Sequence, residues 1–120
     1  MHQANGDMPV MLEGDGLSVR SVAFEGMRAN ILEIPAGVDF TPALKGLPDD
    51  LCPAPHWGYV LEGSVNFRGK DGTEEKVSAG EVFCLSAGHT AWTTEPVKFF
   101  EVSPAAEMEQ LLNHVKNASG

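Results

Sequence analysis

The sequence has few basic residues and no long apolar run. Eight Lys and Arg residues stand against 17 Asp and Glu residues, which gives a formal net charge of −9. Because no basic patch or basic run is present, nucleic acid and anionic membranes are not expected as partners. No segment approaches the roughly 20 apolar residues of a transmembrane helix. The N-terminus has no basic region followed by an apolar run, so we expect no signal peptide and a cytoplasmic location.

Cysteine is also scarce, with Cys52 and Cys84 the two in the chain. In the cytoplasm, two cysteines are more often free thiols or metal ligands than a disulfide. Cys84 lies in the apolar segment 82–85, so we expect it to pack in the core. Cys52 lies in an irregular, proline-rich segment and is a candidate ligand or reactive thiol, although no residue nearby in sequence indicates a lowered pKa.

Length and composition fit one globular domain. A chain of 120 residues can bury a single core, and 42% hydrophobic residues argue against disorder. We expect residues 1–16 to form an N-terminal tail or edge strand, 17–104 a β-barrel, and 105–120 a C-terminal helix and tail. Ser103 is the predicted N-cap of this helix and Pro104 its first residue.

Short apolar segments separated by turn residues predict a β protein. Glu62, Gly63 and Ser64 predict a hairpin turn between two of the strands. Evenly spaced short strands are typical of a closed sheet or a sandwich. The irregular segment 39–55 is either a loop over the mouth of the barrel or a simple surface connection. The predicted strands are 17–24, 28–34, 58–61, 65–68, 73–77, 82–85, 89–93 and 97–102.

Two stretches resemble the motifs of the cupin superfamily. Residues 59–63, YVLEG, with the antiparallel return after them resemble the first motif, and residues 80–89, GEVFCLSAGH, resemble the second. The resemblance covers roughly residues 17–104 and is to small single-domain bacterial cupins of no settled activity. It implies an all-β cupin (jelly-roll) β-barrel with a short C-terminal α-helix. It also implies a homodimer, to which a strand at 10–12 could contribute by crossing to the partner.

The resemblance implies a metal site inside the barrel, but the ligand pattern departs from the usual one. The two histidine positions of the first motif fall on Leu51 and Pro53, and that of the second motif falls on Ala91. None of these side chains can bind a metal. His56 stands at the glutamate position of the first motif. The usual site of three histidines and one glutamate is therefore absent, and the iron or manganese dioxygenase activity associated with it does not carry over.

Cys52, His56 and His89 form an alternative set of metal ligands. A turn at Pro53 and Pro55 would let Cys52 and His56 meet at one ion. His89 lies two residues before the vacant position of the second motif, and residues two apart on a strand share a face. One thiolate and two imidazoles suit Zn²⁺, with iron or manganese as alternatives. The competing interpretation makes His56 a hydrogen-bonded core histidine and His89 a residue of the barrel rim.

Aromatic and acidic residues add further candidates, and three functions stay open. Tyr59 could act as a general acid or hydrogen-bond donor in a barrel pocket, although Tyr59, Trp57 and Trp92 could equally be core residues. Glu101 either faces the interior and completes a metal site or lies exposed at an edge. The chain could be a metal-binding barrel for a small organic ligand. It could instead be a metal-dependent isomerase, lyase or dioxygenase-like enzyme on a small polar substrate, or a non-catalytic structural dimer.

Overall fold

A computed structural model describes residues 1–119 and confirms an all-β fold with one C-terminal helix. Gly120, the last residue of the predicted tail, lies outside the described residues. Three short 3₁₀ helices, η1 (Asn5–Asp7), η2 (Thr41–Leu44) and η3 (Pro48–Asp50), lie in the connections. The strands and helix are β1 (Val10–Gly14), β2 (Leu17–Phe24), β3 (Met27–Ile34), β4 (His56–Gly69), β5 (Glu74–Ser78), β6 (Val82–Leu85), β7 (His89–Trp92), β8 (Val97–Pro104) and α1 (Ala105–Ser119).

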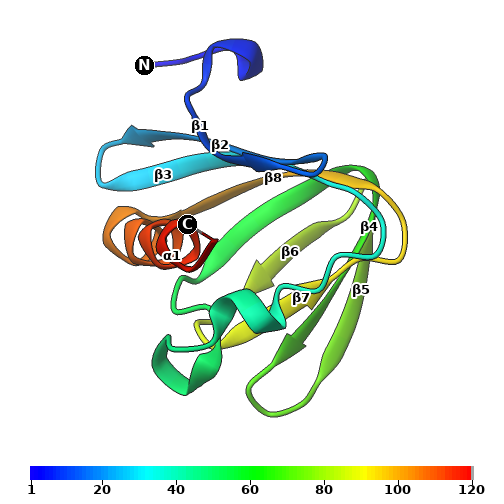
Figure 1. The fold of residues 1–120 in the computed structure, drawn as a ribbon. Helices are drawn as coiled ribbons and strands as arrows, with labels where there is room; N and C mark the ends of the chain where they lie inside the picture. The colour runs from blue at the N-terminus through cyan, green and yellow to red at the C-terminus, as the bar shows by residue number, and fades with distance from the viewer. Residues whose placement is uncertain (120) are drawn as a thin grey trace.

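The strands pair in the order β1-β2-β3-β8-β4-β5, and β6 and β7 pair with β4. Every pairing is antiparallel. In Figure 1, β1, β2, β3 and β8 form one layer, and α1 lies beneath it, near the segment that carries η2. Among residues 1–119 no ladder joins β5 back to β1, so the sheet does not close into a complete barrel. The N-terminal strand β1 pairs with β2 of its own chain.

The 14-residue strand β4 connects this layer to a second layer, which contains β5 and β7. Its first half pairs with β6 and β8, and its second half pairs with β5 and β7. The hairpin turn predicted at Glu62, Gly63 and Ser64 is wrong, because the chain continues as one strand through these residues. The register with β8 shifts between Val60 and Glu62, and Gly63 has a φ of +74°. The bulge therefore falls at Leu61, and Gly63 lies just after it, where β4 stops pairing with β8 and begins to pair with β5. A glycine with positive φ suits such a bend of a continuous strand as well as a turn.

Gly63 is expected to be indispensable for this bend. A Cβ at this position would overlap the carbonyl oxygen of Pro96, and the positive φ disfavours any L side chain. We expect Gly63→Ala to lower the free energy of unfolding by about 3 kcal/mol or more. Gly72 has a φ of +87°, but a Cβ added there would meet no atom within 4 Å, so Gly72→Ala is the matched control and should cost only about 1 kcal/mol. Urea unfolding measures both, and equal losses would contradict the argument.

Strand β6 alternates between the two faces of the sheet. Phe83 and Leu85 are buried in the core, whereas Val82 is 79% exposed and Cys84 is also exposed. The prediction that Cys84 packs in the core is therefore wrong. An apolar run of four residues suggested a strand buried on both faces, but one face of β6 is open to solvent.

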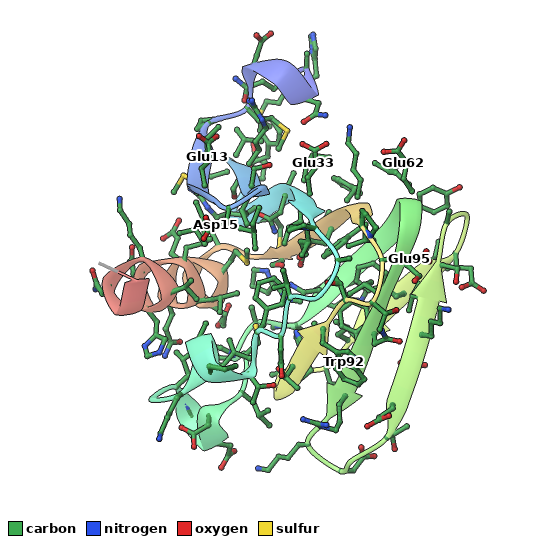
Figure 2. All side chains as sticks on the ribbon, turned by 45° about the vertical axis from the view of Figure 1, so that its right-hand side comes forward. Glu13, Asp15, Glu33, Glu62, Trp92 and Glu95 are labelled. Carbon is green, nitrogen blue, oxygen red and sulfur yellow. The ribbon has the colours of Figure 1, made fainter. Side chains whose placement is uncertain are left out.

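Acidic side chains lie on the outside of the molecule. Glu13, Asp15, Glu33, Glu62 and Glu95 are all exposed, and Figure 2 shows Glu33 and Glu62 projecting from the upper edge of the molecule. The net charge of −9 therefore resides largely at the surface. In the described part of the chain, no helix is both long enough and apolar enough to span a bilayer.

Candidate metal centre and its pocket

The structure brings Cys52, His56 and His89 together from three places in the chain. Cys52 lies in the loop before β4, His56 is the first residue of β4, and His89 is the first residue of β7. The Cys52 N–H donates to the His89 carbonyl at 2.9 Å, and the Gly88 N–H donates to the Cys52 carbonyl at 2.7 Å. The three side chains are 3 to 6% exposed, and their ligand atoms all lie within 4.8 Å of one another. The backbone bridge therefore holds the loop cysteine beside the strand histidine.

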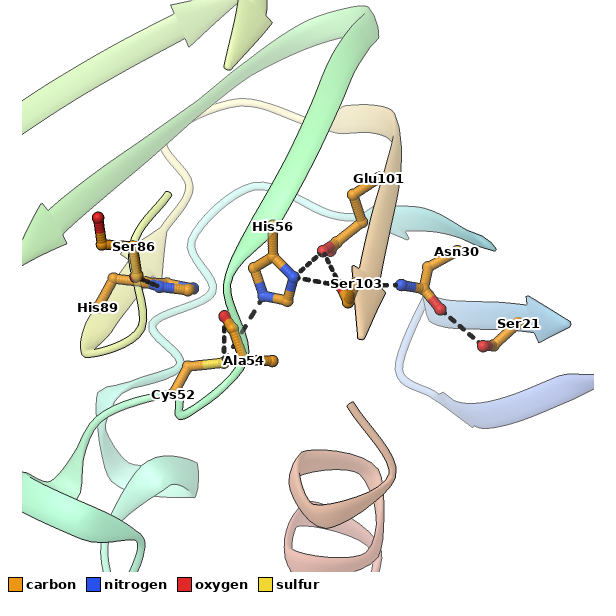
Figure 3. Close-up of polar contacts among 9 residues, drawn as sticks. All are labelled: Ser21, Asn30, Cys52, Ala54, His56, Ser86, His89, Glu101 and Ser103. Carbon is orange, nitrogen blue, oxygen red and sulfur yellow. Dashed lines mark hydrogen bonds and ion pairs between the residues drawn. The ribbon is translucent and has the colours of Figure 1, made fainter. Parts of the chain in front are cut away.

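Both imidazole rings are held through Nδ1. His89 Nδ1 donates to the Ser86 carbonyl at 2.9 Å, because that oxygen can only accept. His56 Nδ1 forms an ion pair with the Glu101 carboxylate and lies 2.5 Å from the Ser103 hydroxyl (Figure 3). Each ring therefore keeps Nε2 for another partner. For His56 that partner is Cys52, whose Sγ lies 3.6 Å from His56 Nε2.

A buried chain of hydrogen bonds stands behind His56 (Figure 3). The Ser21 hydroxyl donates to Asn30 Oδ1 at 2.6 Å, which turns the Asn30 amide nitrogen toward Ser103. Asn30 Nδ2 donates to Ser103 Oγ at 3.4 Å, and the Ser103 hydroxyl donates to Glu101 at 3.3 Å. All four side chains are at most 3% exposed. These hydrogen bonds hold the Glu101 carboxylate in place as the acceptor for His56 Nδ1, and so they fix the orientation of the His56 ring.

Sequence reasoning missed the supporting role of Ser103 and Asn30 and left Glu101 undecided. The prediction that Ser103 caps the helix is wrong, because β8 continues to Pro104, which pairs with Met27. Residues 99, 101 and 103 consequently all face the interior. The alternation along β8 was the signal that could have found Glu101 and Ser103. Proline is found at the ends of strands as well as at the start of helices, so Pro104 did not distinguish the end of β8 from the first residue of the helix.

The neighbours of Cys52 and His56 change their pKa values in opposite directions. Burial raises the pKa of Cys52, but hydrogen bonds and charge from His56 and His89 outweigh it and lower this pKa to about 7. Burial lowers the pKa of His56, but the Glu101 carboxylate, helped by Cys52, outweighs it and raises this pKa to about 10. At neutral pH and without a metal, the His56 imidazolium lies between a carboxylate and a partly ionised thiol. The sequence did not indicate this lowered pKa of Cys52 in an obvious way, because the fold is what brings both histidines against the thiol.

The three side chains fit a zinc ion chemically. With Zn–S near 2.3 Å and Zn–N near 2.0–2.1 Å, a tetrahedral zinc holds its sulfur and nitrogen ligands roughly 3.5 Å apart. The separation between Cys52 Sγ and His56 Nε2 is 3.6 Å. Zinc-binding histidines usually donate their second N–H to a carboxylate or a backbone carbonyl, as His56 and His89 do. Three protein ligands leave a fourth position open, which is the pattern of catalytic rather than structural zinc sites.

The three aromatic candidates lie away from this cluster. His56 faces the interior, so the strand period of two turns Trp57 and Tyr59 to the outer face of β4, where they are 47% and 40% exposed. Trp92 lies under the Arg68 guanidinium, whose carbon is 5.5 Å from the ring centre. None of the three lines the pocket beside the cluster. Tyr59 therefore does not reach the pocket, and we assign it no catalytic role.

A cavity of about 310 Å³ borders the cluster. His89 and Ala91 both line it, as expected for two residues on one face of β7. Glu101 lines it too, as do residues 40, 43 and 44 from η2 and its N-terminal flank. The segment 39–55 is therefore a loop over the interior rather than a simple surface connection.

Comparison with solved structures establishes the fold. An RmlC-like cupin from Shewanella frigidimarina superposes with a TM-score of 0.61 at 17% identity, over 85% of this chain and 88% of that chain. The chain has a cupin fold. KdgF from a Halomonas species gives a TM-score of 0.57 at 19% identity, over 84% of this chain and 90% of that chain.

A structure of HppE in its Fe(II) form gives a TM-score of 0.58 at 18% identity, over 86% of this chain but only 59% of HppE. At these identities the likeness concerns the cupin fold alone. No protein-family model matches the sequence. No curated protein sequence matches it either.

Proposed function

We propose that this cupin-fold protein binds a divalent metal through Cys52, His56 and His89 and holds a small organic ligand beside it. The observation that carries the proposal is the orientation of the two imidazoles. Their Nδ1 atoms are engaged by Glu101 and by the Ser86 carbonyl, which leaves Nε2 of each ring for the ion. A mixed sulfur and nitrogen donor set favours zinc over iron or manganese. The Fe(II) form of HppE, a neighbour in fold, makes iron the first alternative to test.

Elemental analysis of the purified protein tests this proposal. We expect about one equivalent of zinc in the wild-type protein and a loss of at least tenfold in bound metal for His56→Ala. His114→Ala is the matched control, because His114 lies on α1 and is absent from the cluster. A folded wild-type protein that holds no metal and takes up no added Zn²⁺, Fe²⁺ or Mn²⁺ would contradict the proposal.

A second candidate function is thiol chemistry without a metal. The side chains are arranged in space as in a catalytic triad, with Cys52 as the nucleophile, His56 as the base and Glu101 as the orienting carboxylate. Cys52 Sγ lies 3.6 Å from His56 Nε2, and His56 Nδ1 pairs with Glu101. The lowered pKa of Cys52, about 7, favours this candidate. The same metal analysis separates the two functions, because a bound ion would occupy the thiolate. In either case an enzyme would act at the cavity beside Cys52.

We also propose that two copies pair through the outer face of β4 and β6. Trp57, Tyr59, Leu61 and Val82 lie there and are 40 to 79% exposed. In a chain with a net charge of −9, these four uncharged side chains form a patch where two copies can approach with less repulsion than elsewhere. We expect a dimeric mass at micromolar concentration by sedimentation, and a monomeric mass for Val82→Lys. A monomeric wild-type protein would contradict the pairing.

Both cysteines are free thiols in the structure. Free thiols suit a reducing compartment, so they support a cytoplasmic location.

A further inference from the structure

From the cavity of about 310 Å³ beside the cluster we infer the class of ligand: an apolar molecule of about ten non-hydrogen atoms with one metal-binding head group. The size follows from the cavity volume, because a group as large as a water molecule occupies roughly 30 Å³ and the cavity therefore holds about ten such groups. This inference rests on the proposed metal site for the head group. It goes beyond that site by specifying the rest of the ligand.

The walls of the cavity are made almost wholly of apolar side chains. Leu32, Phe99, Met108 and Leu112 are at most 9% exposed to solvent and line it from β3, β8 and α1. Further apolar residues come from β1, β2 and η2. Neither Lys nor Arg occurs among the lining residues. An apolar ligand body therefore gains from burial here, whereas a strongly anionic body would meet no Lys or Arg side chain away from the cluster.

The polar lining groups outside the cluster are already engaged. The Thr90 hydroxyl is 1% exposed and lies 2.9 Å from the Thr41 hydroxyl. The Asp39 carboxylate accepts the Thr41 N–H through one oxygen at 2.9 Å, and Asp39 is an exposed residue at the edge of the cavity rather than in its buried part. A sugar-like ligand would bury several hydroxyl groups without partners, which weakens binding. The polar part of the ligand must instead point to Cys52 and the histidines, so a small polar substrate does not suit this cavity.

Helix α1 and η2 form one wall of the apolar chamber. They contact each other, and both contribute lining residues. Met108 and Leu112 come from α1, and Ala43 and Leu44 come from η2. The strand ladders leave the sheet open, and Figure 1 shows α1 and the segment with η2 on the same side of the molecule. The ligand body would therefore lie among these elements with its head group at the metal.

A series of straight-chain alkyl hydroxamates with two to twelve carbons tests this inference, because hydroxamates are strong zinc ligands. With the zinc-loaded protein and calorimetry, we expect affinity to rise about three- to fourfold per methylene. The rise should stop near eight carbons, where the cavity is full. Ala43→Phe should end the rise several carbons earlier. Ala36→Phe is the control, because Ala36 is exposed and does not line the cavity, and it should leave the series unchanged.

The outcomes distinguish a failure of the ligand class from a failure of the metal site. If zinc binds but hydroxamate affinity does not depend on chain length, the apolar class is wrong and the metal site stands. If zinc does not bind, methyl NMR of the metal-free protein decides. Shifts of Leu112 and Val19 methyls with long probes, but not of the exposed Val82, would keep the apolar chamber and remove the metal-bound head group. Unchanged methyl signals would overturn both parts.

Discussion

Saturating Zn²⁺ is expected to raise the midpoint of thermal unfolding by roughly 15 °C. A ligand that binds only the folded state adds about 4 kcal/mol at a thousandfold excess over its Kd. For a domain of this size, 1 kcal/mol corresponds to roughly 4 °C. Differential scanning calorimetry with and without one millimolar Zn²⁺ measures the shift.

The cysteine variants provide the control for this prediction. Cys52→Ala removes the thiolate ligand and should lose most of the shift. Cys84→Ala should keep it, because Cys84 is exposed on β6 and absent from the cluster. The comparison is between shifts with and without zinc in each variant, so any change in the stability of the metal-free protein drops out. A shift of equal size in Cys52→Ala and the wild type would place zinc elsewhere.

Zinc should stabilise the whole fold because its ligands are separated in the sequence but joined by the backbone. Cys52 and His89 form a bridge between the loop before β4 and the start of β7. His56 pairs with Leu85 of β6, while its ring is held from β8 through Glu101. An unfolded chain cannot present these three atoms together. Metal binding and folding are therefore linked, and binding must also release the protons that the thiol and the His56 Nε2 carry without metal.

Most strands could be predicted from local patterns. The bounds of β2 and β6 are those predicted for 17–24 and 82–85. Alternating apolar residues and short spacing were sufficient, because each signal lies within one strand. The predicted hairpin at Gly63 is wrong because a glycine with positive φ suits a tight turn and a bent strand alike, and only the pairing of β4 with four strands separates the two.

The candidate ligands could be predicted, but their support could not. Cysteine and histidine are rare residues with metal-binding side chains, so Cys52, His56 and His89 stand out in the sequence. The role of Asn30 and Ser103 depends on the register that places β2, β3, β8 and β4 side by side. That register depends on contacts between segments far apart in the chain. Tyr59 lies on the opposite face of β4 because it is an odd number of residues from His56, and composition alone does not show which face of a strand a residue occupies.

Cys52 is expected to react with iodoacetamide with a midpoint near pH 7 in the metal-free protein, in a Cys84→Ser background that leaves one thiol. The thiolate is the reactive form, and an unperturbed cysteine has a pKa of about 8.5. The midpoint should lie below that of an ordinary cysteine, because the pKa of Cys52 is lowered to about 7. Below this pH the thiol is protonated and the rate falls. Above it the rate should stay level until His56, whose pKa is raised to about 10, loses its proton.

Substitutions of His56 and Glu101 should raise the midpoint of this reaction by different amounts. His56→Ala removes the imidazolium, so the midpoint should rise above pH 8 and the rate at pH 7 should fall roughly tenfold. Glu101→Gln removes the carboxylate that keeps His56 protonated, so its midpoint should lie between those of the wild type and His56→Ala. Zinc should suppress the reaction in the wild type, because a bound metal occupies the thiolate. A midpoint near pH 8.5 in the metal-free wild type, unchanged by either substitution, would show that Cys52 is an ordinary buried thiol and would remove the main support for thiol chemistry.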